Sequence, residues 1–263
     1  CDDARAATTT LQHAAAEFGS RFVLDLALTV ARPSSNLFAL TSVLLALVTT
    51  FFVYLPGING PFLLDDEVNL KPLNLESLGP QDLKVTILRH PLLGGLSRSV
   101  GNASFALTQF TGGYDPYPYK YQNLLLHLIN GLLLFWFLWL LLPRVLPNQR
   151  TAAWTATFIT TLWLLHPLQV STVLYSVQRY AILSTLFSLL LLIAYVKSRA
   201  LSRLYPFAGA LSMTVAFLIF FPLAILSKEN AILVLPAILV VEGLAFAFAT
   251  QSRREAVAVF GVL

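Results

Sequence analysis

Acidic and basic side chains suited to transfer chemistry stand at three places in this sequence. Asp65, Asp66 and Glu67 are consecutive carboxylates, and a carboxylate can take the proton of an attacking hydroxyl as a general base. Arg179 and Lys228 stand at the ends of apolar stretches. Cations there can bind a phosphate and stabilise the charge that it gains on leaving. These residue types fit group transfer from a phosphate-linked donor held in a lipid bilayer.

Further polar residues share this position at the ends of apolar stretches: His166, Gln178, Glu229 and Asn230. Ionisable groups at membrane depth are costly to bury, which makes them functional candidates. Simpler interpretations stay open. Two adjacent aspartates often belong to a solvated turn, and Arg179 or Lys228 can extend its charged end to the lipid headgroups.

The elements that must position these groups are membrane-spanning helices. The chain of 263 residues is 57% hydrophobic and 11% charged, whereas about 25% of the residues in a soluble domain are charged. Charge is absent from four long stretches, 33–64, 121–143, 151–178 and 204–227. Since about 20 apolar residues cross the hydrocarbon core, the sequence predicts an all-α, polytopic membrane protein. A single cysteine, Cys1, excludes an internal disulfide framework and a multi-cysteine zinc site.

Apolar runs between polar or turn-forming residues predict six spans: Leu37–Tyr54, Leu124–Leu142, Thr151–His166, Ala181–Val196, Pro206–Leu226 and Ala231–Ala249. The apolar run Ala256–Leu263 ends the sequence and indicates the start of a seventh helix, so we expect the chain to be part of a longer protein. Two short interfacial helices are predicted between the first two spans, at Leu83–Leu96 and Ser97–Phe110.

Basic residues follow every second span: Arg144 and Arg150 after the second, Lys197, Arg199 and Arg203 after the fourth, and Arg253 and Arg254 after the sixth. The positive-inside rule therefore predicts a cytoplasmic N-terminus, with residues 1–36 as a cytoplasmic or interfacial segment. The long loop 55–123, and the candidate site with it, is predicted to face outward. The net charge of +4 then reflects membrane topology and not nucleic-acid binding.

Three polar residues inside the second predicted span share one helix face. Asn123, His127 and Asn130 recur at spacings of four and three residues. Polar side chains within a span commonly form hydrogen bonds between helices, so this face is predicted to be a packing seam and not a ligand site.

Four short blocks together resemble one known family. They are Gly60–Glu67 (GPFLLDDE), Arg89–Leu92 through Asn102 with Tyr119–Asn130, Leu165–Val170 with Tyr175–Arg179, and Leu226–Asn230. In this order they resemble the membrane part of GT-C-type glycosyltransferases. The likeness is to the transmembrane tetratricopeptide-repeat O-mannosyltransferases and their bacterial relatives, and it covers about Pro56 to Glu242.

The resemblance implies a GT-C-like bundle over residues 37–263 and an inverting sugar transfer on the outer face of the membrane. The donor would be a polyprenyl- or dolichyl-phosphate sugar and the acceptor a hydroxyl of a protein or glycan. Asp65 and Asp66 would be catalytic, one of them as general base or as ligand to a divalent cation, and metal dependence stays open. Substrate-binding roles would fall to Arg89, Lys120, His166, Gln178, Arg179, Lys228, Glu229 and Asn230.

Two residues of these blocks differ from the eukaryotic pattern. Lys120 stands where many eukaryotic relatives carry His, and Gln178 stands before Arg179 where they tend to carry Gly. Both variants are more typical of bacterial relatives, so a bacterial inner membrane is expected.

Two other functions stay open. A transporter or flippase for lipid-linked sugars predicts inverted repeats and charges near the membrane midplane, whereas most charges here lie at the span ends. A membrane assembly subunit without catalysis is the second alternative. An exchange of aspartate for asparagine at Asp65 and Asp66 distinguishes it, because a scaffold should tolerate that change and a transferase should not.

Overall fold

The computed structural model describes residues 33–73, 98–250 and 253–261. The chain divides into two compact units, Cys1–Thr41 and Ser42–Leu263, and apart from the beginning of one helix everything described below belongs to the second. The described part of the first unit is the beginning of helix α2 (Pro33–Tyr54). Most of the predicted N-terminal segment, the predicted helix Leu83–Leu96 and Arg89 lie outside the described residues.

Five helical segments in the described part of the chain are long and apolar enough to cross a membrane: Leu37–Gly57, Pro116–Val145, Ser176–Ser202, Pro206–Ile225 and Glu229–Phe246. They include most of α2 and all of four further helices: α6 (Pro116–Val145), α9 (Arg179–Ser202), α10 (Pro206–Ile225) and α11 (Val234–Phe246). The described residues form helices and no strand. The predicted all-α class is therefore confirmed for the described residues, and five of their segments have the length and apolarity that crossing a membrane requires.

Helix α6 begins eight residues before the predicted start of the second span. Asp115 caps its N-terminus by accepting a hydrogen bond from the Tyr117 backbone at 2.9 Å, and Pro116 occupies the first helical position. The added turns are polar, but Tyr119, Lys120 and Asn123 are buried there against other segments. Hydropathy alone misses these turns because their burial is supplied by distant parts of the chain.

The third predicted span is the exception to the membrane-spanning pattern. Helix α7 (Gln149–Leu164) has 16 residues, a length of about 24 Å against about 30 Å of hydrocarbon. Pro167 disfavours a helical residue before it, and the chain turns there into the short helix α8 (Gln169–Leu174) and the 3₁₀ turn η3 (Ser176–Gln178). The prediction of six spans is thus not confirmed among the described residues.

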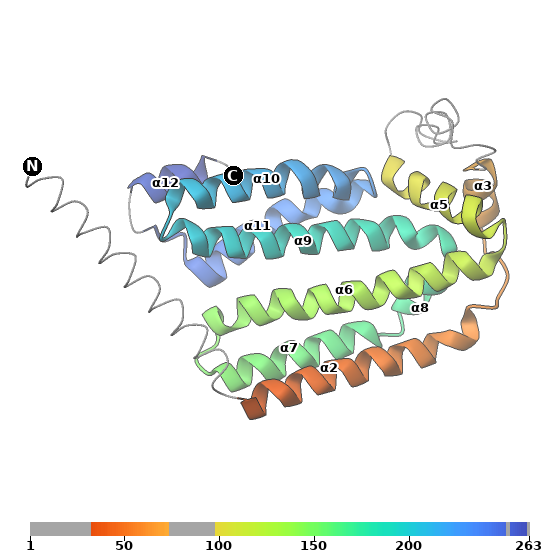
Figure 1. The fold of residues 1–263 in the computed structure, drawn as a ribbon, viewed down its shortest axis with the longest axis horizontal. Coiled ribbons are helices and arrows are strands. Elements are labelled where there is room, and N and C mark those ends of the chain that lie inside the picture. Colours follow the sequence, from red (N-terminus) through yellow and green to blue (C-terminus); the bar gives the residue numbers. More distant parts are fainter. Residues whose placement is uncertain (1–32, 74–97, 251–252, 262–263) are drawn as a thin grey trace, which may run out of the picture. The chain divides into compact units, whose positions relative to one another are not determined.

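Shorter elements occupy the connections between the long helices. η1 (Leu55–Gly57), α3 (Asp66–Leu70), η2 (Lys71–Leu73) and α5 (Ser99–Gly112) precede α6, and α5 confirms the predicted short helix Ser97–Phe110. η4 (Glu229–Leu233) leads into α11, and α12 (Arg253–Phe260) follows it. The long helices α6, α9 and α10 run side by side, with α3 and α5 near one end and α12 near the other (Figure 1).

The main apolar core lies among α6, α9, α10 and α11, with Phe135, Leu191, Met213 and Ile238 among its buried members. Helices α9 and α10 approach closely because Gly209 lies against the backbone of Ser202. A smaller apolar cluster, which includes Leu70, Phe105 and Tyr180, joins α3, α5 and α9. This second cluster supports the polar groups that the sequence singled out.

Candidate functional site

Asp66 is completely buried and binds backbone amides from two distant segments. Its carboxylate accepts hydrogen bonds from Leu63 at 3.0 Å, from Val177 at 2.8 Å and from Ser176 at 3.4 Å. Burial raises the pKa of Asp66 above its ordinary value of 3.8, and these amides oppose that shift. The carboxylate therefore fastens α3 to η3 and is not open to a substrate.

Asp65, in contrast, is exposed at the N-cap of α3. The Asn69 side-chain amide holds it by donating to the Asp65 carboxylate at 3.2 Å and to its carbonyl oxygen at 2.8 Å. The preceding residue, Leu64, has the left-handed backbone φ of 48°, which is uncommon for a residue with a side chain. The turn thus sends one carboxylate inward and leaves its neighbour accessible and oriented.

Lys120 stabilises the same segment from α6. Its ammonium donates to the carbonyl oxygens of Gly60 at 2.9 Å and Pro61 at 2.7 Å, and it lies close enough to Asp66 for their charges to attract. The side chain is almost completely buried. Lys120 therefore holds the chain that leads into α3, because its ammonium binds backbone carbonyl oxygens of that segment.

Arg179 is, with Arg199, one of the two largest fully buried side chains in the described part of the chain. All three guanidinium nitrogens donate to neutral oxygens: Asn123 Oδ1 at 2.8 Å, Thr108 Oγ1 at 2.6 Å, Ser104 Oγ at 3.2 Å and the Tyr119 carbonyl at 2.8 Å. The group also stacks on the rings of Phe105 and Tyr119, at 4.7 and 5.6 Å. Arg179 thus joins α5, α6 and α9 beneath the exposed surface.

A second charged group lies where α5 meets the turn before η4. Arg98 forms an ion pair with Glu229 at 3.2 Å and lies over the Tyr180 ring at 5.2 Å. The Val100 amide donates to the Leu226 carbonyl oxygen at 3.1 Å, which joins the two segments. The phenol of Tyr180 is within electrostatic reach of Arg98, Asp65 and Glu229. Asp65 and the Arg98–Glu229 pair therefore lie around the same phenol, and we call this group of charged side chains the Asp65 surface.

Lys228 adds a cation to the Asp65 surface. It is half-buried, and its ammonium has no hydrogen-bonding partner among the described residues. Burial lowers the pKa of Lys228 below its ordinary value of 10.5, the neighbouring charge of Arg98 lowers it further, and Glu229 opposes this. An anion that binds next to this partly buried ammonium would stabilise its charge.

The remaining candidate residues have weaker connections to this surface. The exposed His166 accepts a hydrogen bond from the Leu168 amide at 3.2 Å, which caps the turn before α8. Gln178 is half-buried at the N-cap of α9, and Asn230 is exposed in η4. Neither of these two side chains hydrogen-bonds to another described residue.

The predicted packing seam on α6 is confirmed. Asn123 donates to the Ser176 carbonyl oxygen at 3.1 Å, and Asn130 donates to that of Ile182 at 2.9 Å. His127 Nε2 lies 3.1 Å from the Leu164 carbonyl oxygen and the ring stacks on Trp163. All three side chains are buried and bind backbone groups of neighbouring segments, so they stabilise the bundle.

Sequence reasoning missed Arg98, Tyr180 and the polar residues that surround Arg179. Arg98 was one of several charges in a long loop, and its pairing with Glu229 spans 131 residues, so no local pattern could single it out. Ser104 and Thr108 offered a usable signal, because their spacing of four places both hydroxyls on one face of a helix.

The described part of the chain is an all-helical protein with five membrane-length segments, and the Asp65 surface involves α3 and α5, which lie near one end of the long helices (Figure 1). No protein-family model, no curated protein and no solved structure matches the chain.

Proposed function

We propose that the protein is a glycosyltransferase that moves a sugar from a polyprenyl-phosphate donor to an acceptor hydroxyl at the Asp65 surface. The reaction, a direct displacement, inverts the anomeric centre. The proposal rests on the resemblance of four sequence blocks to GT-C-type enzymes and on one structural observation. That observation is the different position of two adjacent aspartates: Asp66 is buried and accepts backbone hydrogen bonds, whereas Asp65 is exposed.

Asp65 supplies the base for this reaction. Its carboxylate takes the proton of the acceptor hydroxyl while the hydroxyl oxygen forms a bond to the anomeric carbon. The bond from that carbon to the phosphate oxygen breaks, and the lipid phosphate leaves with the electron pair. The fixed turn at Leu64 and the Asn69 hydrogen bonds hold Asp65 in one orientation, which favours a defined attack geometry.

Lys228 is the group best suited to the leaving phosphate. Its half-buried ammonium has no protein hydrogen bond among the described residues, and the guanidinium of Arg98 lies nearby. A charge that is partly removed from water interacts strongly with the negative charge that develops on the phosphate. Arg179, whose nitrogens donate to protein oxygens, acts here by positioning α5 and α6 against α9.

A transfer assay with the full-length protein in membrane vesicles tests the proposal. A polyprenyl-phosphate carrying a labelled sugar is supplied, and incorporation into acceptor is compared for wild type, Asp65→Asn and Glu67→Gln. Glu67 is the matched control, because it is an exposed carboxylate only two residues away. We expect Asp65→Asn to reduce the rate by about 100-fold or more, the usual contribution of a general base, and Glu67→Gln to leave it near wild type.

Donor-dependent transfer at the wild-type rate in Asp65→Asn would contradict the role of the Asp65 carboxylate as general base. Wild-type protein that binds the donor lipid, transfers no sugar and moves the lipid between leaflets would support the transporter alternative instead.

A further inference from the structure

The opposite end of the long helices holds a second charged group, which the proposed function does not use. We call it the Arg199 end, and it comprises the last turns of α6, α9 and α11, the first turn of α7, and α12. The described side chains there include five basic residues: Arg144, Arg150, Lys197, Arg199 and Arg203. The described carboxylates at this end are those of Glu242 and Glu255.

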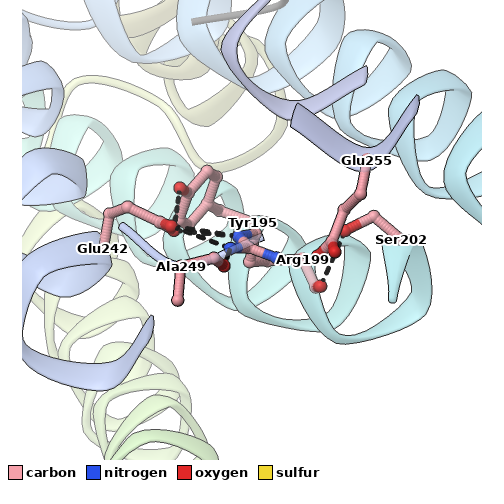
Figure 2. Close-up of polar contacts among 6 residues, drawn as sticks. All are labelled: Tyr195, Arg199, Ser202, Glu242, Ala249 and Glu255. Atoms are coloured by element: carbon pink, nitrogen blue, oxygen red, sulfur yellow. Dashed lines mark hydrogen bonds and ion pairs between the residues drawn. The ribbon is translucent and has the colours of Figure 1, made fainter. Parts of the chain in front are cut away.

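Both of these carboxylates bind Arg199. Glu242 accepts hydrogen bonds from the Arg199 Nε at 3.1 Å and from the Tyr195 hydroxyl at 2.7 Å, and Glu255 accepts from Nη1 at 2.5 Å. Figure 2 shows Glu242 and Glu255 on opposite sides of the guanidinium. All three charged side chains are buried. Both negative charges therefore bind one internal arginine.

The same arginine also fixes the position of Phe246. Its guanidinium lies 4.9 Å from the centre of the Phe246 ring, and its Nη2 donates to the Ala249 carbonyl oxygen at 2.5 Å. Between these contacts the chain passes through two left-handed residues, Ala247 and Phe248, with φ of 52° and 53°. Such conformations persist only where the surroundings enforce them, so the Arg199 contacts hold Phe246 in place.

Two further arginines approach the fixed ring from other helices. Arg144 of α6 lies 5.7 Å from the ring centre, and Arg203, which follows α9, lies 5.5 Å from it. Both residues are exposed, and neither forms an ion pair with a described carboxylate. The two positive charges are close enough to repel each other. An anion between the two guanidiniums would remove this repulsion.

We propose that Arg144 and Arg203 bind the phosphate of an anionic phospholipid headgroup at the Arg199 end. Arginine is suited to this role because its planar guanidinium donates two parallel hydrogen bonds to phosphate oxygens.

The surroundings favour a membrane lipid over a soluble anion. Arg144 belongs to the last turn of a membrane-length helix, and Arg203 stands three residues before another. Leu204 and Phe207 are exposed beside Arg203, with 68% and 82% of their surfaces accessible, and can contact acyl chains. Basic groups between helices at the membrane surface are a known means of recognising anionic headgroups.

Native mass spectrometry of the purified, detergent-solubilised full-length protein tests this site. Phosphatidylglycerol and phosphatidylcholine are added in equal amounts, and the bound fraction of each is measured for wild type, Arg144→Gln, Arg203→Gln and Arg150→Gln. Arg150 is the matched control, since it is an exposed arginine at the same end with no Phe246 contact. All variants are compared as monodisperse species by size exclusion.

We expect wild type to retain phosphatidylglycerol in preference to phosphatidylcholine. Arg144→Gln and Arg203→Gln should each reduce that retention about fivefold, the loss expected for one basic residue near an anionic surface, and Arg150→Gln should not. Equal retention of the two lipids by wild type would overturn the proposed site. The same loss in all three variants would also overturn it, because non-specific electrostatic attraction would be weakened equally by the removal of any of these arginines. Displacement of the lipid by millimolar inorganic phosphate overturns the assignment to a phospholipid.

Discussion

Arg179 shows how a charged side chain can act as a structural joint within a helical bundle. Its guanidinium is buried, contacts α5 and α6 from α9, and donates only to neutral oxygens among the described residues. Each oxygen left without its donor after a substitution would carry the cost of a buried, unsatisfied polar group. The residue matters to the Asp65 surface through the elements that it holds together.

We therefore predict that Arg179→Lys destabilises the protein by about 1–3 kcal/mol, even though it conserves the charge. The single ammonium of lysine cannot occupy the positions of three guanidinium nitrogens. The measurement is the temperature at which half of the detergent-solubilised protein is lost from the folded peak in size exclusion. Arg150→Lys, at an exposed site, is the control and should match wild type. An unchanged midpoint for Arg179→Lys would contradict the structural role.

The pH dependence of donor use gives a second prediction at this scale. Lys228 binds phosphate only while protonated, and burial and Arg98 lower its pKa from 10.5. A lowered pKa means that the proton is lost at a lower pH, so the KM for the donor should rise with pH before an ordinary lysine would titrate. Lys228→Arg should move this rise to higher pH, whereas Lys71→Arg, at an exposed lysine, should leave it in place. A profile identical in Lys228→Arg would exclude Lys228 as the titrating group.

At the scale of elements, the local sequence predicts where the helices lie, whereas the burial and the partners of their residues depend on contacts with distant parts of the chain. Apolar runs located the five membrane-length helices of the described chain, although the last of them contains Glu242. The spacing of Asn123, His127 and Asn130 predicted the seam on α6. Arg199 was read as a basic residue of a loop, yet it lies in α9 and is buried. Its partners Glu242 and Glu255 are 43 and 56 residues away, so no local pattern contains that information.

The packing of α9 against α10 gives a prediction for an element contact. A Cβ at Gly209 would lie 2.5 Å from the Ser202 Cα and 2.6 Å from its backbone nitrogen, and backbone atoms cannot rotate away. Gly209→Ala should lower the free energy of unfolding by about 1–3 kcal/mol, although alanine favours helices. The control is Gly243→Ala, whose Cβ would meet only the Phe248 ring, at 3.3 Å. Equal thermal midpoints for the two variants would contradict the close approach.

At the scale of the whole second unit, the bond between Asp66 and η3 fixes the course of the chain. Asp66 lies before α6 and Val177 lies after α8, yet they are joined at 2.8 Å. Helix α6 takes the chain to the Arg199 end, and α7 and α8 must together return it to the Asp65 surface. Hydropathy predicted a single helix for this return because His166 and Pro167 interrupt the apolar run only at its end. The sequence also grouped Asp65 with Asp66, because it cannot show which of two neighbours faces Val177.

The central claim is that Asp65 is the general base and that Asp66 holds α3 against η3. Paired measurements on Asp65→Asn and Asp66→Asn test this claim most directly. Sugar transfer per folded molecule and the thermal midpoint are measured for both variants of the full-length protein. Asp65→Asn should abolish transfer and leave the midpoint near wild type. Asp66→Asn should destabilise the protein by about 1–3 kcal/mol and so lower the midpoint, because its amide nitrogen would face backbone N–H donors. The molecules that remain folded should retain transfer. The reverse pattern, with an active Asp65→Asn or a stable but inactive Asp66→Asn, would contradict this assignment of roles.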